Sequence, residues 1–291
     1  MKLATFRYNQ QRCLGLVDVD TKMVSIFDLT IENAKNGAQY LLDTLSEGGE
    51  LPKIRETTSL DSVELEAPLP RPRRNIFCAG KNYLDHVKEV AKSGLGSGPT
   101  SGSEAPTYPI IFTKVPESVI APQAKILRHA NLTNHLDYEA ELAVVIGKKG
   151  QGISRENAME HVWGYTIIND VSARDLQKKH QQWHIAKSLD SFCPMGPWLV
   201  SKDEFDGNNT AIRCWVNDEL RQDSSTSLFI FDIPALIESL SAGITLYPGD
   251  IIATGTPSGV GMGFNPPRFL QSGDKVKIEI AGIGVLENVV E

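Results

Sequence analysis

The stretch that most constrains this chain is residues 137–142, Asp-Tyr-Glu-Ala-Glu-Leu, which continues into Ala-Val-Val-Ile-Gly at 143–147. The apolar, β-branched part predicts a buried strand that stops at Gly147. Side chains alternate between the two faces of a strand, so Glu139 and Glu141 point the same way. Two adjacent buried carboxylates repel each other and lose hydration. A Mg²⁺, Mn²⁺ or Ca²⁺ ion between them is the usual remedy, and a solvated acidic strand start is the alternative.

The composition is that of an ordinary soluble globular protein, with 291 residues, 41% of them hydrophobic and 22% charged. The net charge of −7 argues against nucleic acid as a partner and favours a small molecule. The four cysteines form no C-x-x-C pair, which indicates free thiols in a reducing cytosol. No apolar leader and no span of eighteen apolar residues is present, so we expect a cytoplasmic protein without a membrane segment.

Residues 1–66 are predicted to form a small α+β domain. Strand-like runs cover residues 3–8, 13–19 and 23–27, and a helix is expected near 38–45. Residues 67–74 alternate proline with other residues and carry three arginines. This pattern predicts an extended linker with solvated charges. The linker opens a second domain at residues 67–291.

A candidate general base follows the linker. Residues 75–80 are predicted to be a strand and residues 81–90 a helix, on which His86 and Glu89 share one face. A carboxylate beside an imidazole orients it and raises its basicity, although a chance pair on a surface helix is the alternative. The Gly/Ser-rich residues 92–106 come next, so we expect a mobile lid over about residues 83–106 or disorder without a function.

A third carboxylate, Asp170, ends the predicted strand at 163–168 and could complete a metal site. Ser172 and Asp175 match the S-x-x-D pattern of a helix capping box, which gives Asp175 a structural role. The next residue of interest, Arg174, is a candidate functional cation.

Further polar residues lie downstream. Gln177 shares a helix face with Arg174. Lys187 lies among apolar residues and is either a snorkelling surface residue or a fixed cation for a substrate carboxylate. The glycine-rich loop at 254–263 fits neither G-x-S-x-G nor G-x-G-x-x-G, but its N–H groups and Thr hydroxyls could line a polar pocket.

Together these stretches resemble the fumarylacetoacetate hydrolase superfamily over residues 67–291. The matching segments are Gly80-Lys81-Asn82-Tyr83 with His86 and Glu89, residues 137–142, residues 169–175, Ala186-Lys187-Ser188, and residues 249–257. The resemblance implies a strand-rich α+β fold, with a mixed β-roll catalytic domain and a small N-terminal domain, and it implies a homodimer. Two departures matter. The family's G-R-N-Y has lysine as its basic residue here, which puts that residue's role in doubt, and no match exists for the namesake enzyme's fourth carboxylate ligand.

The resemblance also assigns roles. It implies Mg²⁺ or Mn²⁺ held by Glu139, Glu141 and Asp170. It implies that Lys187 helps to bind or polarise the substrate. It also implies that His86 and Glu89 match the catalytic dyad of the acylpyruvase and oxaloacetate decarboxylase branch. Other residues expected near the substrate are Arg174, Gln177 and Thr256.

The charges favour a 2-oxo acid substrate. Three carboxylates on a divalent cation leave one negative charge, and Lys187 with Arg174 makes the site net positive. We expect hydrolysis of a C–C bond in 3-acylpyruvates such as fumarylpyruvate, with the metal stabilising a pyruvate enolate. The same enolate serves oxaloacetate decarboxylation, tautomerisation, 2-hydroxyhepta-2,4-diene-1,7-dioate isomerisation and 5-oxopent-3-ene-1,2,5-tricarboxylate decarboxylation. A metal-dependent binding protein without turnover is the non-enzyme alternative.

Overall fold

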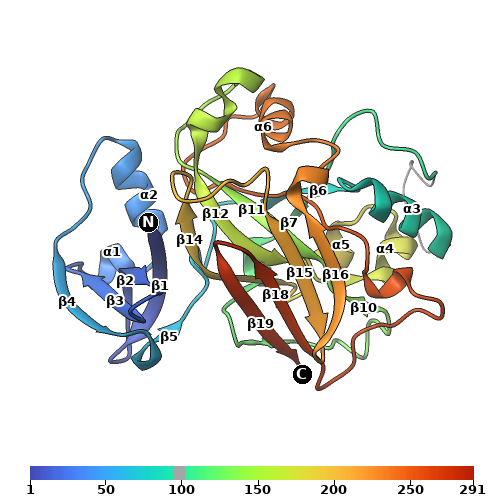
Figure 1. The fold of residues 1–291 in the computed structure, drawn as a ribbon, viewed down its shortest axis with the longest axis horizontal. Coiled ribbons are helices and arrows are strands. Elements are labelled where there is room, and N and C mark those ends of the chain that lie inside the picture. Colours follow the sequence, from blue (N-terminus) through green and yellow to red (C-terminus); the bar gives the residue numbers. More distant parts are fainter. Residues whose placement is uncertain (95–101) are drawn as a thin grey trace.

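The computed structural model describes residues 1–94 and 102–291 and has a strand-rich α+β fold, as predicted (Figure 1). Within these residues one twelve-stranded sheet runs through the whole molecule. Its main path is, in spatial order, β4 (Ile54–Ser59), β3 (Met23–Phe27), β2 (Gln11–Asp18), β1 (Lys2–Tyr8), β14 (Cys193–Ser201), β12 (Val162–Asn169), β11 (Ala140–Ile146), β17 (Ile251–Ala253), β6 (Ile76–Gly80) and β7 (Ile110–Lys114). Two short strands extend it, β5 (Glu64–Leu65) beside β1 and β8 (Val119–Ile120) beside β14.

A second, five-stranded sheet packs against the large one through β11, β12 and β14. Its spatial order is β16 (Glu219–Ser225), β15 (Ala211–Val216), β18 (Lys275–Ile280), β19 (Gly284–Val290) and β9 (Lys125–Ile126). A separate pair consists of β10 (Leu136–Asp137) and β13 (Ser172–Ala173).

Strand β11 is buried on both faces. Leu142 and Val144 belong to the apolar core shared with the second sheet, whereas Ala143 and Val145 belong to a core on the opposite face. Burial on both sides explains why the sequence runs through five apolar residues without polar alternation. The odd-numbered positions share a face, so Glu141 precedes Ala143 on the side away from the second sheet.

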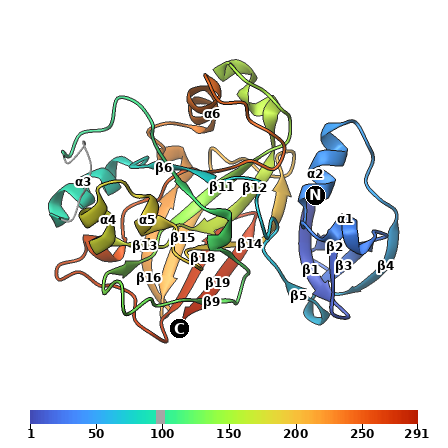
Figure 2. The same ribbon diagram turned by 180° about the vertical axis from the view of Figure 1, so that it is seen from behind.

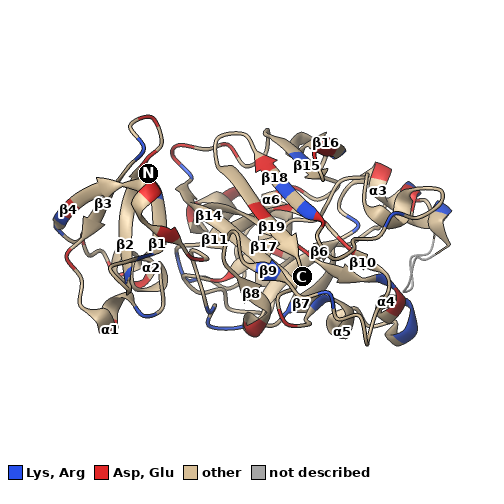
Figure 3. Ribbon diagram, turned by 90° about the horizontal axis from the view of Figure 1, so that it is seen from below, with Lys and Arg blue, Asp and Glu red and all other residues tan. Residues whose placement is uncertain are grey.

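The helices of the described residues are short, from 4 to 10 residues. They are α1 (Ile31–Ala34), α2 (Gln39–Ser46), α3 (Leu84–Ser93), α4 (Arg174–His180), α5 (His184–Lys187) and α6 (Ile233–Ser241), with 3₁₀ turns η1 (Leu60–Ser62), η2 (Pro116–Ser118), η3 (Arg155–His161), η4 (Thr226–Leu228) and η5 (Gly261–Gly263). Helices α3, α4 and α5 gather at the end of the molecule opposite the N-terminal strands (Figure 2). Among the described helices, none has the length and apolarity that a membrane crossing requires. Basic and acidic positions are interspersed along the ribbon (Figure 3).

The N-terminal region is joined to the rest by β-pairing. Strand β1 lies antiparallel to β14, with Leu3 opposite Leu199. The predicted linker at 67–74 has solvated charges at Arg71 and Arg73, which are exposed. Arg74 departs from this prediction, because it pairs with the buried carboxylate of Asp250, and Pro68 and Leu69 are buried as well. The domain boundary at 66/67 stays a prediction.

The helix predicted at 81–90 begins later, at Leu84. Lys81 has a φ of 54°, in the left-handed region, and Tyr83 is extended, so the chain turns before the helix starts. The Asn82 side chain holds this turn through hydrogen bonds with the backbone of Phe231 and Thr254. The predicted lid at 83–106 includes residues 95–101, which lie outside the described part.

Candidate active site

The three predicted metal ligands converge. One carboxylate oxygen each of Glu139, Glu141 and Asp170 lies within 4.8 Å of the others, and all three residues are buried. Strand pairing causes this, because Ala140 lies opposite Asn169 on the antiparallel neighbours β11 and β12. Residues on either side of that pair therefore meet, and the Asp170 N–H donates to the Glu139 carbonyl at 2.9 Å.

Buried cations surround the carboxylates. Lys187 Nζ lies 2.7 Å from Glu139 Oε2 and 2.6 Å from Asp170 Oδ2. Arg174 contacts Glu139 Oε1 at 2.7 Å and, through Nε, Asp137 Oδ2 at 2.8 Å. Sequence reasoning had left open whether Lys187 is a surface residue, and its 2% exposure settles that it is not.

Lys114 and Asp137 are two members of the site that sequence reasoning missed. Lys114 is fully buried, lies 2.6 Å from Asp170 Oδ1 and also donates to the carbonyls of Val171 and Lys187. Its signal was a charged residue ending the apolar strand at 110–114. Asp137 had been noted only as part of the acidic stretch.

The environment shifts the pKa values of Glu139 and Glu141 in opposite directions. Burial alone would raise the pKa of Glu139, but Lys187 and Arg174 outweigh it and hold that pKa well below its usual value. The pKa of Glu141 is raised well above its usual value by burial and by the charges of Asp170 and Glu139. Glu141 accepts a hydrogen bond from the Gly255 N–H at 2.8 Å, which only partly offsets this. Burial and the neighbouring negative charges thus favour the neutral form of Glu141 in this cluster.

The charge balance predicted from sequence holds for a different reason. Asp137 adds one negative charge to the predicted set, and Lys114 adds one positive charge. These two additions cancel. Three paired carboxylates, those of Asp137, Glu139 and Asp170, face the three cations and balance them while Glu141 is neutral. A divalent cation would favour the ionised form of Glu141, and the cluster with the cation would then carry one positive charge.

The donor set fits a divalent metal ion. Three buried carboxylates supply only hard oxygen ligands, and these favour Mg²⁺ or Mn²⁺ over thiolate-preferring metals. The hydroxyl of Tyr83 is buried beside this cluster, and it has no hydrogen-bond partner among the described residues. An unsatisfied hydroxyl next to crowded carboxylates is consistent with a site that binds further polar groups.

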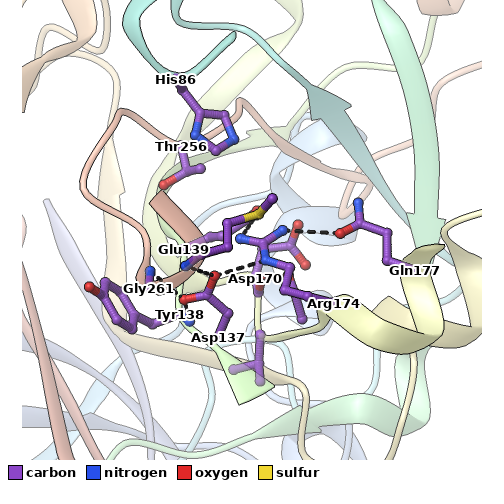
Figure 4. A network of polar contacts seen from close by, with 12 residues as sticks. His86, Asp137, Tyr138, Glu139, Asp170, Arg174, Gln177, Thr256 and Gly261 are labelled. Carbon is purple, nitrogen blue, oxygen red and sulfur yellow. Dashed lines mark hydrogen bonds and ion pairs between the residues drawn. The ribbon is translucent and has the colours of Figure 1, made fainter. Parts of the chain in front are cut away.

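The predicted dyad is in contact. His86 Nδ1 lies 3.0 Å from Glu89 Oε2, and Glu89 Oε1 accepts a hydrogen bond from the Gly259 N–H at 2.8 Å. Both residues are on α3, and the His86 ring faces the site beside Thr256, above Glu139 (Figure 4). The proximity is also electrostatic, since His86 contributes to lowering the pKa of Glu139.

One cavity joins these groups. Its walls include the predicted residues and several others: Ala79, Gly80, Lys81, His86, Val90, Phe112, Glu139, Glu141, Arg174, Gln177, Trp183, Lys187, Thr256 and Met262. Gln177 accepts a hydrogen bond from Arg174 at 3.2 Å, and Thr256 accepts one from Gln222 at 2.8 Å. Lys81 is only 6% exposed, and burial lowers its pKa. The lysine that replaces the arginine of G-R-N-Y therefore lines this cavity.

The predicted capping box at Ser172 and Asp175 is wrong. Ser172 belongs to β13 and donates to the Asp170 carbonyl, and α4 begins at Arg174 without a side-chain cap. Asp175 instead accepts hydrogen bonds from Thr133 Oγ1 at 2.5 Å and the Asn134 N–H at 3.2 Å. The strand pairing of Ser172 with Asp137 removes it from the position a cap needs.

Fold and site together define an enzyme that places a histidine–glutamate pair over a buried carboxylate cluster. The family profile described as fumarylacetoacetate (FAA) hydrolase C-terminal matches residues 75–291, and the chain belongs to this family. Oxaloacetate tautomerase YisK of Bacillus subtilis is 54% identical over all of both chains. Oxaloacetate tautomerase fahd2, mitochondrial, of Xenopus laevis is 45% identical over 80% of this chain and 70% of that one. The structure of a fumarylacetoacetate hydrolase from Exiguobacterium antarcticum superposes with a TM-score of 0.83 at 41% identity, covering 100% of this chain and 99% of that one.

Proposed function

We propose that this protein is an oxaloacetate tautomerase that depends on Mg²⁺ or Mn²⁺ and interconverts the keto and enol forms of its substrate. The observation that carries the proposal is that His86, paired with Glu89, lines one cavity with Glu139 and Glu141 of the carboxylate cluster. The proposal is also supported by the full-length similarity to a protein named as an oxaloacetate tautomerase.

The chain's own residues suit a proton transfer. Ionised Glu89 accepts a hydrogen bond from the Nδ1–H of His86, so the neutral ring keeps its unprotonated nitrogen at Nε2. Nε2 then removes a proton from carbon 3 of the keto form, and the resulting imidazolium gives that proton to the oxygen on carbon 2, which yields the enol and restores the neutral ring. In the reverse direction Nε2 takes the proton of the enol hydroxyl and returns it to carbon 3. The burial of His86, at 5% exposure, limits competition from bulk water.

The remaining groups would bind the substrate. Glu139, Glu141 and Asp170 would hold the metal ion, which when bound supplies positive charge beside the oxygen atoms of the 2-oxo acid. Lys187 and Arg174 hold the carboxylate of Glu139 in place. Lys81 adds a cation to the cavity wall, where it would bind the second carboxylate of a dicarboxylate substrate.

The hydrolase function expected first from the sequence uses the same dyad to activate water for attack on an acylpyruvate. The two relatives named as oxaloacetate tautomerases favour tautomerisation over hydrolysis. Tautomerisation requires only proton transfer, without cleavage of a carbon–carbon bond. Hydrolysis, decarboxylation and isomerisation are therefore the competing outcomes of the test.

The test begins with the enol form of oxaloacetate and follows the loss of its ultraviolet absorbance, with parallel detection of pyruvate. We expect the purified protein with Mg²⁺ or Mn²⁺ to accelerate ketonisation without releasing pyruvate, and EDTA to abolish the acceleration. His86→Gln should lower kcat by about 10²- to 10⁴-fold, the usual contribution of a general base. Glu139→Gln should weaken Mn²⁺ binding measured by calorimetry.

Each alternative has its own product. Pyruvate released faster from acetylpyruvate than from oxaloacetate would establish a hydrolase. Pyruvate released from oxaloacetate at the rate at which the substrate is lost would establish a decarboxylase. Tautomerisation that persists in EDTA would contradict the role of the metal ion, and full activity of His86→Gln would remove the dyad from the mechanism.

A further inference from the structure

The general base of the proposed reaction is carried by a helix that stands apart from the sheet. Helix α3 lies at the far end of the molecule, and its first turn is tied to the protein core by the turn at Lys81–Tyr83 (Figure 2). His86 and Glu89 need a second attachment if they are to face the carboxylate cluster in one orientation. The contacts of Glu89 identify that attachment.

Glu89 is held from two sides. Its Oε2 atom meets His86 Nδ1 at 3.0 Å, and its Oε1 atom accepts the Gly259 N–H at 2.8 Å. The single peptide N–H of Gly259 thus sets the plane of the carboxylate that orients the imidazole. The orientation of the His86 ring therefore depends, through Glu89, on the position of Gly259.

The residue Gly259 is itself held in place on its carbonyl side. Its carbonyl oxygen accepts the hydroxyl hydrogen of Tyr138 at 2.8 Å, and its φ is 102°. A Cβ atom at this position would overlap the carbonyl oxygen of Arg221, so only glycine fits. Tyr138 is fully buried and lies between Asp137 and Glu139 in the sequence, and its hydroxyl donates to the Gly259 carbonyl.

The following residues of the loop bind Asp137, the neighbour of Tyr138 in the sequence. Asp137 accepts the N–H groups of Gly261 at 2.6 Å and Met262 at 3.0 Å while it pairs with Arg174 (Figure 4). Val260 and Met262 then pack against Val90 of α3 in a small apolar cluster. The loop at 259–263 therefore connects Asp137 and Tyr138 to helix α3. It is joined to the first two residues by hydrogen bonds, and to α3 by the hydrogen bond with Glu89 and by apolar contacts.

We propose that Tyr138 is a positioning residue for the general base: its hydroxyl donates to the carbonyl of Gly259 and so fixes this residue, whose N–H orients Glu89 and through it His86. This inference rests on the proposed function, because it takes His86 as the group that moves the proton. It adds a residue that contacts neither the carboxylate cluster's metal-facing oxygens nor the dyad directly, and that acts over two hydrogen bonds.

The test compares Tyr138→Phe with Tyr165→Phe. Tyr165 is also a buried tyrosine, but its hydroxyl lies by Asp206 and Gly207, away from the cavity, so this variant controls for the loss of a buried hydroxyl. We expect Tyr138→Phe to lower kcat about tenfold, the effect of one lost hydrogen bond of about 1.4 kcal/mol, with KM and Mn²⁺ affinity unchanged. Tyr165→Phe should change kcat less than about twofold, because its hydroxyl is not connected to the dyad.

A double-mutant cycle shows whether Tyr138 acts through Glu89. In a Glu89→Gln background, Tyr138→Phe should lower kcat by less than about twofold, since the carboxylate it positions is gone. An additive tenfold loss in that background would overturn the proposal, as would an unchanged kcat or a loss confined to KM.

A second variant approaches Glu89 from the other side. Gly263 is exposed, and a Cβ atom there would overlap Glu89 Oε1, so Gly263→Ala should displace the carboxylate while the fold is kept. We expect the same loss of kcat at constant KM and the same non-additivity with Glu89→Gln. Full activity of Gly263→Ala would contradict the argument.

Hydrogen exchange supplies a readout that does not depend on turnover. Mass spectrometry of peptides covering residues 84–93 should show faster exchange in Tyr138→Phe than in the wild type or in Tyr165→Phe, because α3 is less firmly attached. Equal exchange would overturn the inference. A wild type that fails to tautomerise oxaloacetate would instead overturn the proposed function, while this exchange measurement would still decide whether Tyr138 holds α3.

Discussion

At the scale of single residues, the site depends on charges that balance each other away from water. Asp170 is fully buried and contacts two lysines, Lys114 on one oxygen and Lys187 on the other. Removing one partner of such a buried pair leaves a charge without compensation, which costs more than the pair itself contributes. The three residues should therefore tolerate substitution only together.

Lys114→Met is expected to lower the free energy of unfolding by about 3–5 kcal/mol, because Asp170 loses a buried cation. The measurement is urea unfolding of the metal-free protein at pH 7. Combining Lys114→Met with Asp170→Asn should recover part of the loss. Equal instability of the single and double variants would show that the methionine disturbs packing rather than charge.

Lys81→Met is expected to reduce discrimination between substrates. Lys81 is buried in the cavity wall, where a charge-assisted hydrogen bond to a second carboxylate is strong. We expect KM for oxaloacetate to rise about tenfold or more, with Lys81→Arg retaining part of the affinity. The measurement is deuterium exchange at carbon 3 of oxaloacetate and of 2-oxobutanoate, which lacks the second carboxylate. An equal loss for both substrates would contradict this role.

At the scale of elements, a side chain that the sequence pattern assigns to the start of one helix instead joins that helix to a distant segment. Asp175 lies in the first turn of α4 but holds the segment at Thr133 and Asn134. Burial alone would raise the pKa of Asp175, yet the hydrogen bonds from Thr133, Asn134 and Leu176 together lower it. The ionised carboxylate is therefore the form that stabilises the fold.

Asp175→Asn should destabilise the protein by about 1 kcal/mol at pH 7. Because the folded pKa of Asp175 lies below the unfolded value near 3.9, its contribution is present above that value and is lost as the pH falls through the folded pKa. The difference in unfolding free energy between wild type and variant should disappear in acid. Asp85→Asn, at an exposed position, is the control and should change stability by less than about 0.5 kcal/mol. A difference that is independent of pH would contradict the role of the charge.

At the scale of the whole molecule, the N-terminal region completes the large sheet. Leu3 and Leu14 share an apolar core with Met195 and Leu199, and β1 covers the edge of β14. A chain lacking residues 1–66 would expose that strand edge and the apolar side chains behind it.

We expect the fragment 67–291 to aggregate or to lose its cooperative unfolding transition. Size-exclusion chromatography and thermal unfolding of the fragment beside the full chain make the comparison. A monodisperse fragment with an unchanged Tm would show that residues 1–66 form an independent domain, as the predicted boundary implies. Light scattering of the full chain in the same experiment would test the predicted homodimer.

The sequence by itself determined the features that depend on neighbours in the chain. The buried strand at β11 follows from an apolar run that ends in glycine, and the contact of His86 with Glu89 follows from their spacing on one helix. The convergence of Glu139, Glu141 and Asp170 was predictable from strand alternation and from the family resemblance together.

Only the tertiary structure decided which distant residues complete the site. Lys114 reaches Asp170 across 56 positions, and Tyr138 reaches Gly259 across 121. Contacts of this kind leave no periodic pattern in the sequence. They depend on which segments are neighbours in the folded structure and not on the spacing of residues along one strand. The same reason explains the wrong capping box: Ser172 pairs with β10, and that distant pairing outweighs the local preference of Ser172 for a helix start.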